Sequence, residues 1–179
     1  MTILLKLSAA IDWLSTQVGK LAVWCVFAAA LISAGNAISR YAAGASSNAW
    51  LEIQWYLFAG MVMLGGPATL RLNGHVRVDL IYGNMRPRAQ AWLDLVCTLL
   101  FLMPAVGIIL WLSWPLFANS FAIGETSNNA GGLLRWPVKL LLPVGFGLMA
   151  LQGLSEIIKR VATLTGHREF ESRYVKPVQ

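Results

Sequence analysis

The stretch LAVWCVFAAALISAGNAI, residues 21–38, contains no charged side chain and lies between Lys20 and Arg40. An α-helix needs about 20 mostly apolar residues to cross the hydrocarbon core of a bilayer. The stretch is therefore long enough for one crossing, and its charged neighbours mark the two water boundaries. The polar segment before it is long for a signal peptide, so we expect these residues to remain as a transmembrane helix.

Three further stretches are similarly long and mostly apolar, at residues 50–70, 95–114 and 140–158. Arg71 closes the first of them, Asp94 and Pro115 flank the second, and Lys139 and Lys159 flank the third. Most of the tryptophans lie near the predicted ends, where an indole ring prefers the headgroup region. The sequence predicts an all-α protein, an integral membrane four-helix bundle.

The composition supports a membrane protein and argues against a nucleic-acid-binding one. Hydrophobic residues make up 57% of the chain and charged residues 12%, with a mean hydropathy of +0.61. Such a chain has too little polar surface for a soluble domain of this length. The net charge is +6, but the basic residues lie between apolar stretches and form no basic stripe, so we expect no nucleic-acid partner.

The distribution of basic residues predicts the orientation, because cytoplasmic loops carry an excess of lysine and arginine. With four spans, one side holds Lys6, Lys20, Arg71, Arg77, Arg86, Arg88, Lys159, Arg160, Arg168, Arg173 and Lys176. The other side holds Arg40, Arg135 and Lys139. We therefore expect a multi-pass protein of the cytoplasmic (inner) membrane of a bacterium or archaeon, with both termini in the cytoplasm.

The segments outside the spans are predicted to lie on or beyond the cytoplasmic membrane surface. Residues 2–17 place isoleucines and leucines on one helical face, with Lys6, Asp12 and Gln17 off that face, which indicates an amphipathic helix lying flat on the lipid. Residues 166–179 are polar and lack apolar periodicity. We expect a membrane domain over residues 1–165 and a cytoplasmic tail over 166–179.

Ionisable residues inside the spans are few, which argues against chemistry in this chain. Glu52 and Asp94 fall near the starts of their predicted helices, where amide dipoles favour a carboxylate. Gln54, like Asn36, is a candidate for hydrogen bonding to another helix. His75 and Asp79, on either side of Arg77, share a face if that loop is helical, which favours a structural or partner contact.

The chain also lacks the residues for a cofactor or metal. It has two histidines, one in a predicted loop and one in the tail, which cannot supply a bis-histidine haem within the bilayer. Cys25 and Cys97 lie singly in apolar stretches. We expect no catalytic, cofactor-binding or metal-ligating residues, and hence no enzyme.

The order of these pieces resembles the small membrane subunit (DctQ-like) of tripartite ATP-independent periplasmic, or TRAP, transporters. The resemblance rests on Glu52 followed by Gln54-Trp55-Tyr56, on Leu64-Gly65, on Asn73-Gly74-His75-Val76-Arg77-Val78-Asp79, and on Trp136-Pro137 with Leu142-Pro143. The His-Val-Arg-Val-Asp run is the most specific part, and together the pieces span nearly the whole chain.

The resemblance implies a large multi-span permease subunit and a periplasmic substrate-binding protein as partners, with membrane lipid around the bundle. Uptake of an organic acid or similar solute would be driven by an ion gradient, usually sodium, and the sodium and substrate sites would lie in the large subunit. This chain would be a fixed scaffold for that subunit. Glu52, His75, Arg77 and Asp79 would stabilise loops or subunit contacts.

Two alternatives remain from the residues alone. A self-contained small four-helix exporter needs a carboxylate well inside the membrane, and Glu52 lies near a helix end. A membrane anchor of a quinone-linked dehydrogenase would normally carry histidines inside its helices. Proton-coupled uptake by the chain alone would favour the first alternative, and a haem absorbance band the second.

Overall fold

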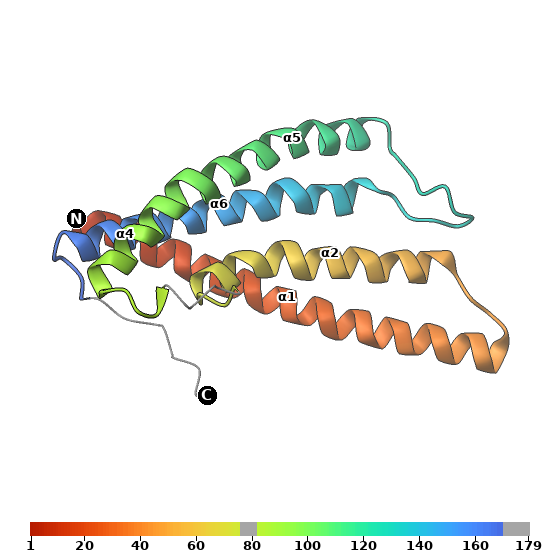
Figure 1. The fold of residues 1–179 in the computed structure, drawn as a ribbon. Helices are drawn as coiled ribbons and strands as arrows, with labels where there is room; N and C mark the ends of the chain where they lie inside the picture. Colours follow the sequence, from red (N-terminus) through yellow and green to blue (C-terminus); the bar gives the residue numbers. More distant parts are fainter. Residues whose placement is uncertain (76–81, 170–179) are drawn as a thin grey trace.

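The chain is all-helical in its computed structural model, which describes residues 1–75 and 82–169 (Figure 1). The expected helical class is therefore confirmed. The π-helical segment η1 (Thr98–Leu102) joins α4 to α5 in one continuous rod. The other elements are α1 (Thr2–Ala43), α2 (Asn48–Arg71), α4 (Pro87–Cys97), α5 (Met103–Ala122) and α6 (Trp136–Leu164).

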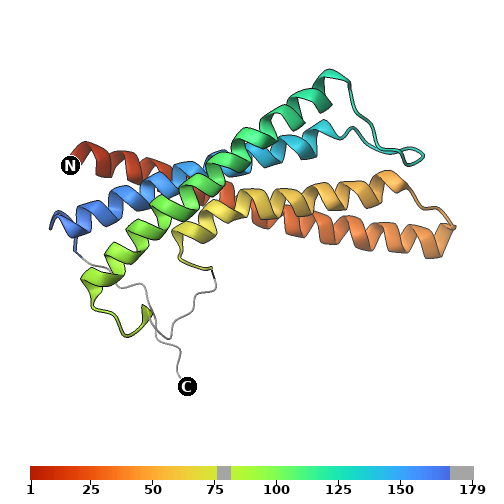
Figure 2. The same ribbon diagram turned by 45° about the horizontal axis from the view of Figure 1, so that its top comes forward.

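The helices pack as two antiparallel hairpins. Residues 44–47 join α1 to α2, and Gly44 takes the left-handed conformation (φ 64°) that ends α1. Residues 123–135 join α5 to α6. Figures 1 and 2 show the two hairpins diverging toward these loops, while α4, the start of α1 and the end of α6 gather at the opposite end.

Three helical stretches in the described part of the chain are long and apolar enough to cross a membrane: Thr2–Ala43, Pro87–Ala122 and Trp136–Leu164. α2 has 24 residues but is not among them. Its first two turns contain Glu52 and Gln54 and it ends at Arg71, which lowers its hydropathy. The prediction of four spans is thus confirmed for three, and the span at residues 50–70 stays a prediction.

The prediction of an amphipathic surface helix at residues 2–17 is wrong. These residues form the start of α1, a single apolar helix of 42 residues. The sequence contains no proline and no glycine before Gly19 to interrupt the helix, so it runs on into the predicted span. At 1.5 Å per residue α1 is about 63 Å long, roughly twice the thickness of a hydrocarbon core.

The third predicted span also begins and ends differently from the prediction. Its helix begins at Pro87, so Asp94 lies in the third turn of the rod and is not at a helix start. The rod continues through Pro115 to Ala122, although Pro115 was expected to end it. In η1 the Met103 amide donates to the Thr98 carbonyl, a widened turn immediately before Pro104, which has no amide hydrogen to donate.

The bundle places many apolar side chains outside and small or polar ones between its helices. Trp111 on α5 is 80% exposed, as suits a surface in contact with hydrocarbon. Between α2 and α6 the backbones approach closely at Gly145, where an added Cβ would lie 2.7 Å from Met63 Cβ. Small residues allow this kind of contact in membrane bundles.

Candidate functional site

Two clusters of polar side chains lie at opposite ends of the described bundle. At the end with the loop 123–135, Glu52 is the central group, and its side chain is buried. The other end holds a network between α1 and α6 and an ion pair between α4 and α6. Each cluster joins segments that are far apart in the sequence.

Glu52 lies in the second turn of α2 and holds the loop 123–135 against that helix. Its Oε1 accepts hydrogen bonds from Ser127 Oγ and, at 2.8 Å, from Asn129 Nδ2. Its Oε2 accepts one from the Leu133 amide, also at 2.8 Å. A buried carboxylate is stable when donors face both of its oxygens, as they do here.

The same loop is held by three further contacts. Asn48 Nδ2 donates to the Ala130 carbonyl at 3.1 Å, and the Tyr56 hydroxyl donates to the Leu134 carbonyl at 2.9 Å. Lys139 forms an ion pair with Glu125. The hydrogen bond from Lys139 lowers the pKa of the Glu125 carboxyl below its usual value. These contacts therefore fix the position of the loop at the end of the bundle.

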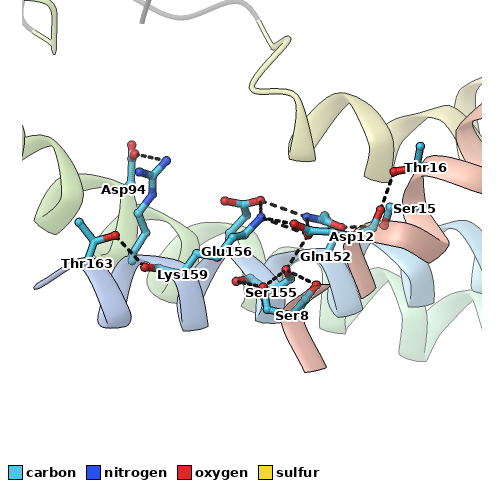
Figure 3. A network of polar contacts seen from close by, with 11 residues as sticks. Ser8, Asp12, Ser15, Thr16, Asp94, Gln152, Ser155, Glu156, Lys159 and Thr163 are labelled. Atoms are coloured by element: carbon cyan, nitrogen blue, oxygen red, sulfur yellow. Dashed lines mark hydrogen bonds and ion pairs between the residues drawn. The ribbon is translucent and has the colours of Figure 1, made fainter. Parts of the chain in front are cut away.

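At the opposite end a polar network joins the N-terminal half of α1 to α6 (Figure 3). Ser155 Oγ donates to Asp12 Oδ1 at 2.7 Å, and Ser8 Oγ lies 2.8 Å from Ser155 Oγ. Lys159 Nζ donates to both oxygens of Asp12 at 3.1 Å. Lys159 also pairs with Glu156 one turn earlier on α6. Ionic and neutral polar groups thus face one another across the two helices.

Gln152 is the centre of this network and is fully buried. Its Oε1 accepts a hydrogen bond from Ser15 Oγ at 2.7 Å. Its Nε2 donates to Asp12 Oδ1 at 2.9 Å and to Glu156 Oε1 at 3.0 Å. Because both ends of the amide have partners, the network meets the condition for a stabilising buried polar cluster.

The ion pair between Asp94 and Arg160 anchors α4 to α6, with 2.9 Å between Oδ2 and Nη2. The same carboxylate oxygen accepts a hydrogen bond from the Tyr82 hydroxyl at 2.9 Å. Gln90, buried on α4, donates to the Tyr82 carbonyl at 2.8 Å. Asp94, one of the two carboxylates considered as intramembrane candidates, therefore has partners within the chain.

The structure places several of the predicted site residues without testing their role in subunit contact. Gln54 donates to the Trp50 carbonyl of its own helix at 3.1 Å, so the described contact is not to another helix. Trp136 and Pro137 are the first two residues of α6, where proline is favoured. The Trp136 ring meets Phe121 of α5 edge-on, with 5.4 Å between ring centroids.

His75 lies just after α2 and is exposed. Arg77 and Asp79 lie outside the described residues, as do residues 170–179 of the predicted tail. The predicted contacts of the His75, Arg77 and Asp79 group therefore stay predictions. The structure brings Glu52 and His75 to opposite ends of α2, so they belong to two separate sites.

The network between α1 and α6 is the feature that the sequence interpretation missed. Asp12 was predicted to lie off the apolar face of a surface helix. The signal was present in the spacing, since polar residues recur at 8, 12 and 15 on α1 and at 152, 155, 156 and 159 on α6. At helical periodicity each set forms one stripe, and two polar stripes of this kind can pair across a helix interface.

Comparison with known proteins relates the chain to one transporter family. The model of the DctQ component of tripartite ATP-independent periplasmic transporters matches residues 29–163. The isethionate TRAP transporter permease protein DctMQ of Oleidesulfovibrio alaskensis is 29% identical over 119 residues, which is 66% of this chain and 18% of that protein. The chain thus spans less than a fifth of this relative's length. No solved structure matches.

Proposed function

The chain belongs to the DctQ component family of TRAP transporters, and from this premise we propose that it is the small membrane subunit that scaffolds a large permease subunit. The observation that carries the proposal is the family match over residues 29–163, which includes the C-terminal part of α1, the whole of α2, α4, η1 and α5, and α6 except for its last residue. Membership in this family and the apolar helices identify an inner-membrane protein of a transport system.

A scaffolding role is supported by how the polar groups of the bundle are used. The buried network of α1 and α6, the Asp94–Arg160 pair and the Glu52 contacts join parts of this chain to one another. Such contacts hold a bundle in a fixed shape, which suits a static support against which a transport domain moves. We assign ion and solute binding, sodium included, to the large subunit.

We further propose a four-span topology with both termini in the cytoplasm. The positive-inside distribution supports this orientation, with Lys139 and Arg135 on the periplasmic side. The loop 123–135 then faces the periplasm, where a substrate-binding protein delivers solute. Hydrogen bonds to Glu52 and Tyr56 fix the backbone of this loop. A loop with a fixed backbone suits a surface that a second protein contacts.

For the solute, we propose an organic acid or a similar small anion. The relative in Oleidesulfovibrio alaskensis is named for isethionate, a small organic acid, and its name joins the DctM and DctQ components. That name also supports a large permease partner for this chain. The exporter and dehydrogenase-anchor alternatives have no comparable support.

Reconstitution tests the proposal. The large subunit and the binding protein from the same gene neighbourhood are incorporated into, or added to, proteoliposomes with and without this chain, and solute uptake is measured under a sodium gradient. We expect co-purification of the two membrane subunits and uptake that requires this chain, the gradient and the binding protein together. Equal uptake without this chain, or uptake by this chain alone, would contradict the proposal.

A further inference from the structure

The rod formed by α4, η1 and α5 packs against α6, and its buried or half-buried residues recur at a regular spacing. One such series is Ala91, Thr98, Val106, Ser113 and Ser120. Successive members are seven positions apart, except that Thr98 and Val106 are separated by eight. A spacing of seven keeps residues on one face of an α-helix. The rod therefore contains one residue more than this series requires, and η1 is the widened turn that accommodates it.

The extra residue adds surface on the outside of the rod. Leu99, Leu100 and Phe101 are 52%, 60% and 70% exposed, and Pro104 is exposed as well. A regular α-helix with a spacing of seven throughout would present the same series of residues to α6. The packing of this chain therefore gives no reason for the widened turn, whose effect is on the outer, apolar face.

The same turn leaves the Leu99 carbonyl without a hydrogen-bond donor from its own helix. In an α-helix this donor would be the Met103 amide, which here donates to the Thr98 carbonyl instead. In a π-helix the donor would be the amide of the next residue, which is Pro104 and has no amide hydrogen. Among the described residues no side chain donates to the Leu99 carbonyl. An acceptor without a partner thus lies on a residue that is half exposed.

The surroundings of this carbonyl favour a protein donor over lipid or water. Residues 95–114 contain no charged side chain, and η1 lies within this apolar run. Hydrocarbon chains donate no hydrogen bond, and a carbonyl left without a partner there costs free energy. In membrane bundles a serine, threonine, asparagine or glutamine of a neighbouring helix commonly provides such a bond.

From this arrangement we infer that η1 is a contact site for a transmembrane helix of the large permease subunit. That helix packs on Leu100 and Phe101 and donates a side-chain hydrogen bond to the Leu99 carbonyl. The apolar side chains alone would suit lipid, but the free acceptor requires a donor that lipid chains lack. The inference rests on the proposed function, because it names the surface through which the scaffold holds its partner.

The first experiment gives the Leu99 carbonyl a donor within its own helix. In Pro104→Ala the new amide can continue the π-type bonding and occupy this carbonyl. We expect the Kd between the purified full chain and the large subunit in detergent to rise about fivefold, as for one lost hydrogen bond. The thermal midpoint of the isolated variant should not fall, because the variant gains a bond. Pro115→Ala is the matched control, an exposed proline of the same rod outside η1, and should leave the Kd unchanged.

A second variant tests whether the extra residue serves the partner. Deletion of Leu100 combined with Pro104→Ala makes the spacing seven throughout the rod and restores an amide to every position of that turn. We expect this variant to keep the helicity and the thermal midpoint of the wild type and to bind the large subunit at least fivefold more weakly. Loss of the fold would show that η1 is needed for packing within the chain, and would overturn the inference.

Photocrosslinking identifies what lies on η1 in the membrane. Leu100 is replaced by p-benzoylphenylalanine, membranes that contain both subunits are irradiated, and the adducts are identified by mass spectrometry. We expect an adduct with the large subunit. Adducts with lipid alone or with a second copy of this chain, or equal effects of Pro104→Ala and Pro115→Ala on the Kd, would overturn the inference. Co-purification of the wild-type subunits without such an adduct would leave the proposed function standing and refute only this contact site.

Discussion

Lys159 Nζ lies 3.1 Å from each carboxylate oxygen of Asp12, across 147 positions of sequence, and so joins the first described helix to the last. Both side chains are largely withdrawn from solvent, with relative exposures of 9% and 20%. The same N-terminal part of α1 exposes Ile3 and Trp13 on the outside. This part of the bundle therefore has a polar interior and an apolar exterior, the reverse of a soluble protein.

Replacing Asp12 by Asn should lower the thermal stability of the purified chain. Lys159 then keeps Glu156 as a partner but loses a charged acceptor, and the cost of an unsatisfied buried group is about 1–3 kcal/mol. The test compares the thermal midpoints of unfolding of the wild type, Asp12→Asn, Lys159→Gln and the double variant. If the two residues interact, the double variant loses less than the sum of the single changes, and strictly additive shifts would contradict the interaction.

Replacing Glu52 by Gln should loosen the loop 123–135. Hydrogen-bond donors face both oxygens of Glu52. In glutamine one of these oxygens becomes an NH₂ group, which is itself a donor, so at least one hydrogen bond to the loop is lost. We expect faster hydrogen exchange of the Leu133 and Arg135 amides. Gln54→Ala, which removes a hydrogen bond within α2, is the matched control and should leave the loop unchanged. Unaltered loop exchange in Glu52→Gln would show that the carboxylate does not hold the loop.

The Glu125–Lys139 ion pair predicts a pH dependence. Because the hydrogen bond from Lys139 lowers the pKa of Glu125 in the folded state, the contribution to stability is fully present above the unfolded-state pKa. It is lost as the pH falls through the lowered, folded-state value. The thermal midpoint of Glu125→Gln should lie below that of the wild type at neutral pH, and the two should converge on acidification. A difference that stays constant with pH would exclude this ion pair as its source.

Gly145 and Gly147 provide a paired test of helix packing. At Gly145 an added Cβ would lie 2.7 Å from Met63 Cβ and 2.9 Å from the Met63 carbonyl oxygen, so α2 and α6 must separate. At Gly147 nothing lies within 4 Å. Gly145→Ala should destabilise by about 1–3 kcal/mol through overpacking, whereas Gly147→Ala should be neutral or stabilising by up to about 1 kcal/mol from helix propensity. Equal thermal midpoints for the two variants would contradict the packing described.

The sequence was sufficient for the parts of the fold that depend on local composition. The apolar run at residues 21–38, with Lys20 and Arg40 beside it, predicts a helix, and these residues lie within α1. It was not sufficient for the extent of that helix, because an amphipathic pattern before residue 20 is compatible with lipid or with a polar partner helix. The choice depended on α6, whose polar stripe lies more than a hundred positions away.

The same limit applies to the sites. Glu52 was singled out from its type and position, yet its partners Ser127, Asn129 and Leu133 come from a loop that local pattern does not place. The helix rod that contains Asp94 was predicted to end at Pro115, because proline often ends helices. It continues because the ring is accommodated inside a long helix, where neighbouring helices supply stability that propensity does not.

The role of His75 and Asp79 in subunit assembly gives a final prediction. Asp79 lies outside the described residues, and His75 is exposed at the end of α2, where a partner can reach it. The charge-removing variants His75→Gln and Asp79→Asn should each reduce co-purification with the large permease subunit about fivefold, as expected for one lost hydrogen bond at an interface. His167→Gln is the control, since this second histidine lies on the exposed turn after α6. Reduced assembly in these two variants but not in His167→Gln assigns His75 and Asp79 to the subunit contact, and unchanged co-purification with unchanged uptake would exclude that role.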